Sequence, residues 1–189
     1  MRITPEGIKL DRELSDLDKF AVDFCKKIDK HTKYVIVSGY VSILLGRTRA
    51  SEDIDMLIPE TDGKNWEKIY SALEEEGYYC LNADAEESYS YLKDGIAVRF
   101  APKKQVIPNM EILFAENKIQ KLAIATSITA TIGKDKIIIS NLELQIAYKE
   151  KILGSPKDIE DANHLREILG KAINVQKLKK YEGMLNENK

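Results

Sequence analysis

Asp53 and Asp55 are the two residues of this 189-residue chain whose types and spacing point most directly to a chemical reaction. They open an apolar run, residues 56–58, that we expect to form a strand. Residues two apart in a strand share a face, so the two Cα atoms would lie roughly 6.6 Å apart. Mg²⁺ usually takes one or two carboxylates from a protein and its other ligands from water and phosphate. The pair therefore predicts a site for Mg²⁺, or for Mn²⁺ in its place, beside a phosphate-bearing substrate.

A small turn lies upstream of the aspartates. Residues 35–37 predict a buried strand that ends at Ser38-Gly39, and we expect a short helix over residues 40–45. Because Gly39 has no side chain, a phosphate could approach main-chain N–H groups there. An isolated Asp-x-Asp pair is more often a solvated strand edge, since short motifs have many false positives. The turn and the pair together favour the phosphate site over that interpretation.

Hydrophobic periodicity predicts the elements around these segments. Apolar residues at three- and four-residue steps indicate helices, and β-branched or aromatic runs between turn residues indicate strands. We expect helices over residues 11–30, 63–76 and, with one break, 142 to the end, and strands over residues 78–81, 88–93, 96–100, 109–114, 128–132 and 136–139. Asp94-Gly95 and residues 133–135 are the expected hairpin turns.

This order of elements predicts an α+β fold with a mixed β-sheet flanked by helices. At 189 residues the chain suits one buried core with a small appendage. We therefore divide it into a core domain, residues 1–140, and a C-terminal helical segment, residues 141–189, packed on that core.

Glu111 is the single charged residue of the strand expected at residues 109–114. A buried carboxylate without a partner costs free energy, because the charge is removed from water without compensation. The strand therefore predicts a partner for Glu111 in the fold.

The helical tail breaks at residues 154–156. Ser155 suits an N-cap, and the following proline suits the first position of a new helix. Lys157, Asp158 and Asp161 then have an ordinary interpretation as the start of that helix, where carboxylates favour the positive end of its dipole.

The composition limits the classes of partner. Lysine and arginine number 29 and aspartate and glutamate 31, so the formal net charge of -2 gives no overall attraction to nucleic acid or membrane. No apolar run approaches the ~18 residues that span a bilayer, and the first residues lack the apolar core of a signal peptide. Cys25, Cys80, His31 and His164 have no metal-like or catalytic spacing. We expect a soluble cytoplasmic protein with no membrane partner.

The same residues carry a resemblance to a known family. The turn at Ser38-Gly39, the pair in Asp53-Ile54-Asp55 and the strand carboxylate Glu111 resemble the pattern of small prokaryotic nucleotidyltransferase-fold proteins of the DNA polymerase β superfamily. Within that superfamily the chain is similar to antibiotic nucleotidyltransferases and to toxin or antitoxin relatives. Their Arg-x-Ser/Thr-x-Asp-hydrophobic-Asp segment appears as residues 49–55, and their later lysine followed by Lys-Asp-hydrophobic-x-Asp appears as Lys149 and residues 157–161.

The resemblance implies a role for each matching residue. Asp53, Asp55 and Glu111 would hold the metal ions and carry catalysis. The residues implied to bind the nucleotide are Ser38, Gly39, Arg47, Arg49, Ser51 and Lys149. The family usually has Gly-Gly or Gly-Ser at the turn, whereas the bulky Tyr40 follows it here and predicts a narrower phosphate pocket. The third carboxylate of the family is usually an aspartate, which is one methylene shorter than Glu111.

The activity implied by the resemblance is Mg²⁺-dependent transfer of a nucleoside monophosphate from a nucleoside triphosphate. The acceptor would be a hydroxyl or amine of a small molecule, a protein or an RNA end. The alternative is a non-catalytic nucleotide-binding or antitoxin-like regulatory protein that retains the fold and has a toxin or antitoxin partner. Haloacid dehalogenase-type hydrolases and glycosyltransferases also use Asp-x-Asp, but they place it after an apolar run, whereas residues 49–52 precede it here.

Overall fold

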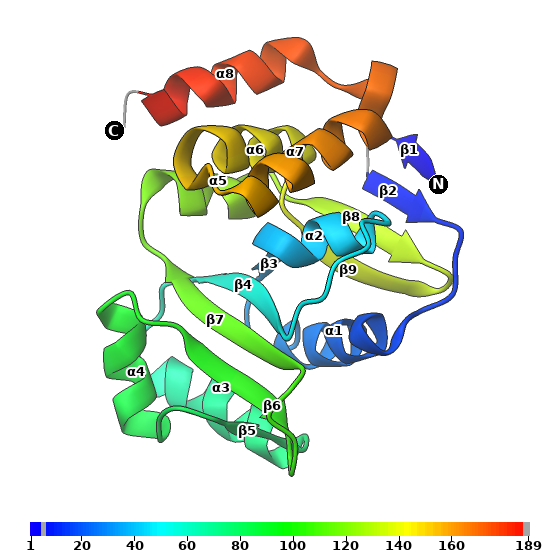
Figure 1. The fold of residues 1–189 in the computed structure, drawn as a ribbon. Coiled ribbons are helices and arrows are strands. Elements are labelled where there is room, and N and C mark those ends of the chain that lie inside the picture. Colours follow the sequence, from blue (N-terminus) through cyan, green and yellow to red (C-terminus); the bar gives the residue numbers. More distant parts are fainter. Residues whose placement is uncertain (5–6, 187–189) are drawn as a thin grey trace.

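The computed structural model describes residues 1–4 and 7–186, and these form one mixed β-sheet with helices on both faces (Figure 1). In sheet order the strands are β1 (Arg2–Thr4), β2 (Gly7–Leu10), β8 (Ile128–Ile132), β9 (Asp135–Ile139), β3 (Val35–Ile36), β4 (Asp53–Pro59), β7 (Asn109–Ala115), β6 (Val98–Pro102) and β5 (Tyr78–Cys80). β4 pairs with β7 in parallel, while β3 and β6 flank this pair in antiparallel orientation. The predicted α+β fold with a mixed sheet is confirmed.

Helices cover the two faces of the sheet in separate groups (Figure 1). One group contains α1 (Asp16–Ile28), α3 (Gly63–Glu75) and α4 (Ala85–Lys93). The other contains α2 (Ser38–Leu44), α5 (Lys118–Ala125) and α6 (Leu142–Tyr148), followed by α7 (Pro156–Leu169) and α8 (Val175–Asn186). A π-helix, Lys149–Leu153, continues α6, and a 3₁₀ turn, Gly170–Ala172, separates α7 from α8. No helix in the described part of the chain is long and apolar enough to cross a membrane.

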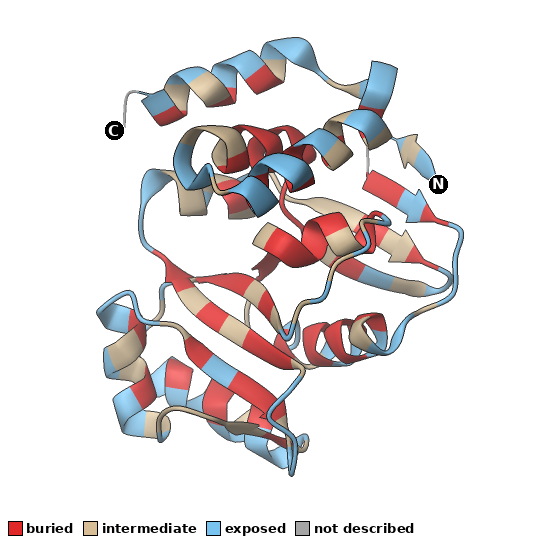
Figure 2. Ribbon diagram, viewed as in Figure 1, coloured by how far each residue is buried: buried red, intermediate tan, exposed pale blue. Residues whose placement is uncertain are grey.

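Aromatic packing decides which face of the central strands is buried. The rings of Phe100 in β6 and Phe114 in β7 have centroids 6.4 and 6.1 Å from that of Trp66 in α3. Alternate residues of both strands are buried on this side, so the residues between them point to the opposite face (Figure 2). β4 pairs in register with β7, with Asp55 opposite Glu111, so the charged residues of both strands share that opposite face. The aromatic core thus determines where the carboxylates lie.

The elements expected on either side of the aspartates are confirmed with small shifts at their ends. The helices expected at residues 11–30 and 63–76 are α1 and α3, and the hairpin expected at residues 128–139 is the β8–β9 pair. The turn after β3 leads directly into α2, as expected.

The prediction of a strand at residues 88–93 is wrong, because this segment belongs to α4. Asp84 caps the helix by accepting a hydrogen bond from the main-chain N–H of Glu87 at 2.9 Å. Asp94-Gly95, expected to form a hairpin turn, instead ends this helix. The tyrosines of the segment resemble a strand in composition, but the N-cap and the first-turn acids favour the helix.

Three further elements, β1, β2 and α5, were not among those predicted. β1 and β2 extend one edge of the sheet, where β2 pairs in parallel with β8. α5 begins with a capping box between Asn117 and Gln120.

The predicted break in the C-terminal helical segment is confirmed. Gly154 has φ +64°, and Ser155 caps α7. Residues 187–189, part of the helix expected to reach the end of the chain, lie outside the described residues.

Tyr40 does not narrow the space above the turn, and that expectation is wrong. Its side chain is fully buried beneath α2, and its hydroxyl donates to Asp18 Oδ1 in α1 at 2.7 Å. The guanidinium of Arg12 binds the same carboxylate at 2.6 Å. Tyr40 therefore ties α2 to α1 instead of facing a ligand.

We expect Tyr40→Phe to lower the free energy of unfolding by about 1–2 kcal/mol, because it removes one hydrogen bond to the buried carboxylate of Asp18. Tyr79→Phe is the matched control, since the Tyr79 hydroxyl donates to the carbonyl oxygen of Gln105 at an exposed site, and its loss should cost less than about 0.5 kcal/mol. Urea denaturation of both variants measures the difference. Equal losses would contradict the structural role assigned to Tyr40.

Candidate functional site

Asp53 and Asp55 lie on one face of β4, as their spacing predicts. Asp53 is opposite Asn109 and Asp55 is opposite Glu111 in the parallel register with β7. The hydroxyl of Ser51 donates to Asp53, at 3.1 Å from Oδ1 and 3.0 Å from the main-chain oxygen. Ser51, predicted to bind nucleotide, thus supports the first aspartate in this structure.

Asp55 holds a poorly compensated negative charge. Burial, and to a smaller extent the charges of Glu111 and Asp53, raise the pKa of Asp55 to about 6. The hydroxyl of Ser38 hydrogen-bonds to the carboxylate and the ammonium of Lys149 attracts it, but both effects are outweighed. The face therefore gathers three carboxylates, and the positive charge near Asp55 is too weak to offset the burial of that residue.

Glu111 has a charged partner, as its position in an apolar strand predicts. This partner is Arg99 of β6. Arg99 lies opposite Glu111 in the antiparallel register, and its Nε donates to Glu111 Oε1 at 2.5 Å. Nothing in the sequence marked this cross-strand pair. The role of Glu111 as a metal ligand or catalytic residue stays a prediction, because its carboxylate is turned to an arginine here.

The side chains on this face that could hold a metal ion are therefore the two aspartates. No cluster of three or more ligating side chains occurs within residues 1–4 and 7–186. Two carboxylates on one face suit Mg²⁺, since that ion commonly completes its octahedral shell with water and substrate phosphates. The burial of Asp55 beside the carboxylate of Asp53, which raises the pKa of Asp55, also fits a cation there.

Ser38 stands in a strained backbone conformation. Its φ is +61°, in the left-handed region that non-glycine residues rarely enter and that is often found at functional sites. Its main-chain N–H donates to Oε1 of Gln145 in α6 at 3.2 Å, and its hydroxyl binds Asp55. Gln145 was not among the predicted residues.

Gly39 leaves room for an arginine. A Cβ atom at this position would lie 2.9 Å from Nη2 of Arg49, so any larger residue would push the guanidinium away. Because the loop before β4 carries Arg49, the missing side chain brings a cation onto the first turn of α2. The sequence predicts that a phosphate approaches the main chain at Gly39. In the structure this space is lined by the guanidinium of Arg49, which is able to bind a phosphate.

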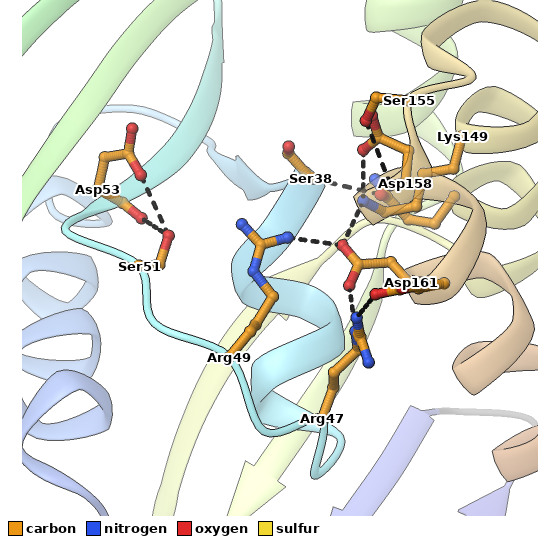
Figure 3. A network of polar contacts seen from close by, with 11 residues as sticks. Ser38, Arg47, Arg49, Ser51, Asp53, Lys149, Ser155, Asp158 and Asp161 are labelled. Carbon is orange, nitrogen blue, oxygen red and sulfur yellow. Dashed lines mark hydrogen bonds and ion pairs between the residues drawn. The ribbon is translucent and has the colours of Figure 1, made fainter.

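Three predicted phosphate-binding cations converge on one carboxylate (Figure 3). Arg47 Nε lies 2.7 Å from Asp161 Oδ1, while Arg49 Nη1 and Lys149 Nζ lie 2.8 and 2.9 Å from Oδ2. Asp161 is fully buried, which alone would raise its pKa, but hydrogen bonds from Lys149 and Arg47 and the charge of Arg49 hold the pKa below its ordinary value. The structure brings Arg47, Arg49 and Lys149 together as a cluster centred on Asp161.

Lys149 is fully buried, although the charged residues that follow it, Glu150 and Lys151, would suit a solvated helix face. Its ammonium also binds Asp158 at 3.3 Å, and Asp158 in turn accepts from the hydroxyl of Ser155. Asp158 and Asp161 therefore do more than begin a helix, whereas Lys157 is exposed. The sequence does contain one signal for the pairing of both aspartates with Lys149. Asp158 and Asp161 are three residues apart, which puts both on one face of α7.

No protein-family model matches the sequence, and no curated protein is similar to it. The fold, in contrast, is similar to that of an antigenic nucleotidyltransferase-like protein from Paracoccidioides brasiliensis, with a TM-score of 0.56 and 16% identity over 90% of this chain and 88% of that chain. The solution structure of the antibiotic-resistance factor ANT(2'')-Ia gives a TM-score of 0.56 and 15% identity over 92% and 94% of the two chains. The chain has a nucleotidyltransferase-like fold. A second structure of ANT(2'')-Ia, in complex with adenylyl-2''-tobramycin, gives a TM-score of 0.54 and 17% identity over 89% and 98%.

The nucleotidyltransferase-like fold confirms the architecture that the motif segments implied. At 15 to 17% identity the similarity establishes the fold, so the chemistry must be argued from this chain's own residues. The resemblance to antibiotic nucleotidyltransferases is confirmed at the level of fold, and the resemblance to toxin or antitoxin proteins stays a prediction.

Replacing Asp55 by asparagine should stabilise the metal-free protein above about pH 6. The folded protein binds the Asp55 proton near this pH, whereas an unfolded aspartate binds it near 3.9, so the folded state holds more protons between the two values. The free energy of unfolding therefore falls as the pH rises through this window. At about 1.4 kcal/mol per pKa unit, Asp55→Asn should be about 1–3 kcal/mol more stable than the native protein at about pH 8 and equal to it at about pH 3.5. Urea denaturation across this pH range tests it, and a variant less stable at every pH would refute the charge argument.

Asp161→Asn should lower the free energy of unfolding by about 3 kcal/mol or more, because it leaves the buried ammonium of Lys149 without its nearer carboxylate. Glu160→Gln is the matched control: Glu160 is exposed and pairs with the same Arg47 at the surface, so its loss should cost no more than about 0.5 kcal/mol. Both values come from urea denaturation. Similar losses would show that burial of Asp161 does not govern the cluster.

Proposed function

We propose that this protein is a nucleotidyltransferase that moves a nucleoside monophosphate from a nucleoside triphosphate to a hydroxyl or amine, with Mg²⁺ held by Asp53 and Asp55. The observation that carries the proposal is the shared face of these two aspartates, where the hydroxyl of Ser38 contacts Asp55 in a nucleotidyltransferase-like fold. When bound, Mg²⁺ would lower the pKa of the acceptor hydroxyl and offset charge on the attacked phosphate and the leaving pyrophosphate.

Each residue of the face has a task in this reaction. Asp53 and Asp55 provide carboxylate oxygens for the metal, and Ser38 fixes the orientation of Asp55. Glu111 lies next to Asp55 on β7, and in this proposal it accepts the proton of the acceptor after its carboxylate leaves Arg99. The acceptor oxygen or nitrogen then forms a bond to the α-phosphorus, and the bond from that phosphorus to the pyrophosphate oxygen breaks.

Arg49 is the cation best placed to bind the triphosphate. One terminal nitrogen of its guanidinium binds Asp161, while the other lies over Gly39 at the start of α2. Arginine can grip two phosphate oxygens at once, and its charge does not depend on pH in the ordinary range. Arg47 and Lys149 stand behind it in the Asp161 cluster and add positive potential at longer range.

A small molecule is the acceptor that we propose. One structural neighbour, ANT(2'')-Ia, is described in complex with adenylyl-2''-tobramycin, an adenylylated small molecule. The net charge of -2 offers no general attraction to RNA, which supports the same choice.

A second candidate is a non-catalytic nucleotide-binding or antitoxin-like protein that keeps the fold. The observation that favours it is that Glu111 is paired with Arg99, and that Arg47, Arg49 and Lys149 are paired with Asp161. Such a protein would bind the nucleotide, would release no pyrophosphate, and would have a toxin or antitoxin as its partner.

Calorimetric titration of ATP, GTP, CTP and UTP with and without Mg²⁺ tests the proposal. We expect Mg²⁺-dependent binding of at least one triphosphate, weakened at least about tenfold in the Asp53→Asn, Asp55→Asn double variant because two metal ligands are lost. Glu52→Gln is the matched control: Glu52 is exposed and precedes β4, so binding should not change.

Failure of all four triphosphates to bind the native protein would overturn the proposed function. Binding without release of pyrophosphate, assayed with hydroxyl- and amine-bearing small molecules, would favour the non-catalytic candidate. Release of pyrophosphate that survives in the double variant would exclude the two aspartates as the metal site.

A further inference from the structure

In the proposed reaction the acceptor approaches from the side of β7 and β6. The attacking and leaving groups of such a transfer lie roughly in line, on opposite sides of the phosphorus. Arg49, the proposed triphosphate cation, lies over Gly39 at the start of α2, which follows β3 on one side of β4. β7 and β6 lie on the other side of β4. The acceptor therefore meets the side chains of these two strands.

Arg99 is the only cation on the strands at this side. β5, β6 and β7, all of whose residues the structure describes, contain no other lysine or arginine. Arg99 is opposite Glu111 and Glu111 is opposite Asp55, so the three residues form a row across β6, β7 and β4. Strands are roughly 4.8 Å apart, which puts the Cα atoms of Arg99 and Asp55 roughly 10 Å apart. Arg99 therefore lies near the proposed metal site without belonging to it.

The guanidinium of Arg99 is only partly used. Its Nε donates to Glu111 Oε1 at 2.5 Å, whereas its two terminal nitrogens have no partner within residues 1–4 and 7–186. The side chain is 49% exposed, so a ligand can reach it from solvent. The two terminal nitrogens of a guanidinium can bind a carboxylate or a phosphate through two parallel hydrogen bonds. Arg99 thus offers a free edge that fits an anion.

The main chain holds Arg99 close against Glu111. The N–H of Arg99 donates to Asn82 Oδ1 at 2.9 Å, and its carbonyl oxygen accepts from the N–H of Leu81 at 2.7 Å. Both groups point toward β5, so Arg99 and Glu111 are a non-hydrogen-bonded antiparallel pair, whose Cα atoms lie roughly 4.5 Å apart. A hydroxyl beside Glu111 and an anionic group on Arg99 are therefore separated by only a few covalent bonds in one small molecule.

We propose that Arg99 determines the specificity for the acceptor by binding an anionic group, a carboxylate or a phosphate, of that small molecule. The inference rests on the proposed function and deepens it, because it names the chemical class of the acceptor. The same contact releases Glu111: the anion competes with the Glu111 carboxylate for one guanidinium. The freed carboxylate then takes the proton of the acceptor hydroxyl, as the proposed reaction requires.

Glycerate, glycerol 3-phosphate and glycerol test this contact, because they share a carbon skeleton and differ in charge. We expect both anions, and not glycerol, to shift the NMR signal of the Arg99 Nε–H in the native protein without metal or nucleotide. The signal is assigned by its loss in Arg99→Gln. The Nε–H signal of Arg166 is the internal control, because this half-exposed arginine is bound through two nitrogens by Glu150 and should not respond.

Substitutions show whether Arg99 is the group that binds. Arg99→Gln should weaken both anions at least about tenfold, because a charge-assisted contact is lost. Arg166→Gln is the matched control and should leave their binding within about twofold. Glu111→Gln should strengthen the anions about two- to fivefold, because the competing carboxylate is removed. The anion that binds more tightly to the native protein identifies the group as carboxylate or phosphate.

Pyrophosphate release links the contact to the acceptor. Among hydroxyl- and amine-bearing small molecules, anionic members should have a kcat/KM at least about tenfold above neutral members of the same skeleton. Arg99→Gln should lose this preference while it still binds Mg²⁺-ATP. Release with neutral or cationic members alone would overturn the inference, and release with no member would remove the acceptor role of Arg99 in favour of the non-catalytic candidate.

The binding experiments can also overturn the inference. They do so if glycerol or the cationic analogue 3-amino-1,2-propanediol binds as tightly as the anions, or if Arg99→Gln binds the anions unchanged. Displacement of the anions by Mg²⁺-ATP would put them in the triphosphate site and have the same meaning. Because the anion titrations need neither metal nor nucleotide, their failure beside intact binding of Mg²⁺-ATP would reject this inference and leave the proposed function standing.

Discussion

The buried carboxylate of Asp161 is the interaction on which the arrangement of the site depends. It receives Arg47 and Arg49 from the loop between α2 and β4, and Lys149 from the π-helix after α6. Segments more than a hundred residues apart in sequence are thereby fixed beside one another. A buried ion cluster adds little net stability compared with an apolar one, but breaking it is costly, so it specifies one geometry. That geometry sets the loop from which β4 and its aspartates begin.

Two regions of opposite charge meet at the start of α2. On one side, Asp53, Asp55 and Glu111 gather negative charge on the open face of β4 and β7. On the other side, the cations of the Asp161 cluster reach as far as the Arg49 nitrogen above Gly39. A metal ion with a triphosphate has the complementary pattern, positive where the aspartates lie and negative where Arg49 lies. The two regions therefore have the charge pattern that the proposed function requires.

The sequence predicted those features that follow from local periodicity. The shared face of Asp53 and Asp55 needs only the two-residue repeat of a strand, and the β8–β9 hairpin needs only its turn. Features set by contacts between distant segments could not be derived this way. The Arg99 pair of Glu111 depends on the register of β6 with β7, and the burial of Tyr40 depends on Asp18 of α1.

The segment at residues 88–93 shows a different kind of failure, in which two local signals compete. Tyrosines favour a strand, yet an N-cap at Asp84 and buried residues four apart, Ser88 and Leu92, favour a helix. Trp66 donates to the Ser88 hydroxyl at 2.8 Å, so packing on α3 adds to the helical choice. The strand prediction followed from the tyrosine content alone, because it took no account of the N-cap at Asp84.

Ser38 links the aspartates to the C-terminal helices. A residue with φ +61° would usually be glycine, so a serine there carries a backbone cost of the order of 1 kcal/mol that some other interaction must offset. Its hydroxyl binds Asp55, and its N–H binds Gln145 of α6. α6 also continues into the π-helix that holds Lys149. A small shift of α6 would therefore be felt at Ser38 beside the paired aspartates and at the cation cluster together, which makes this helix the element that couples the two.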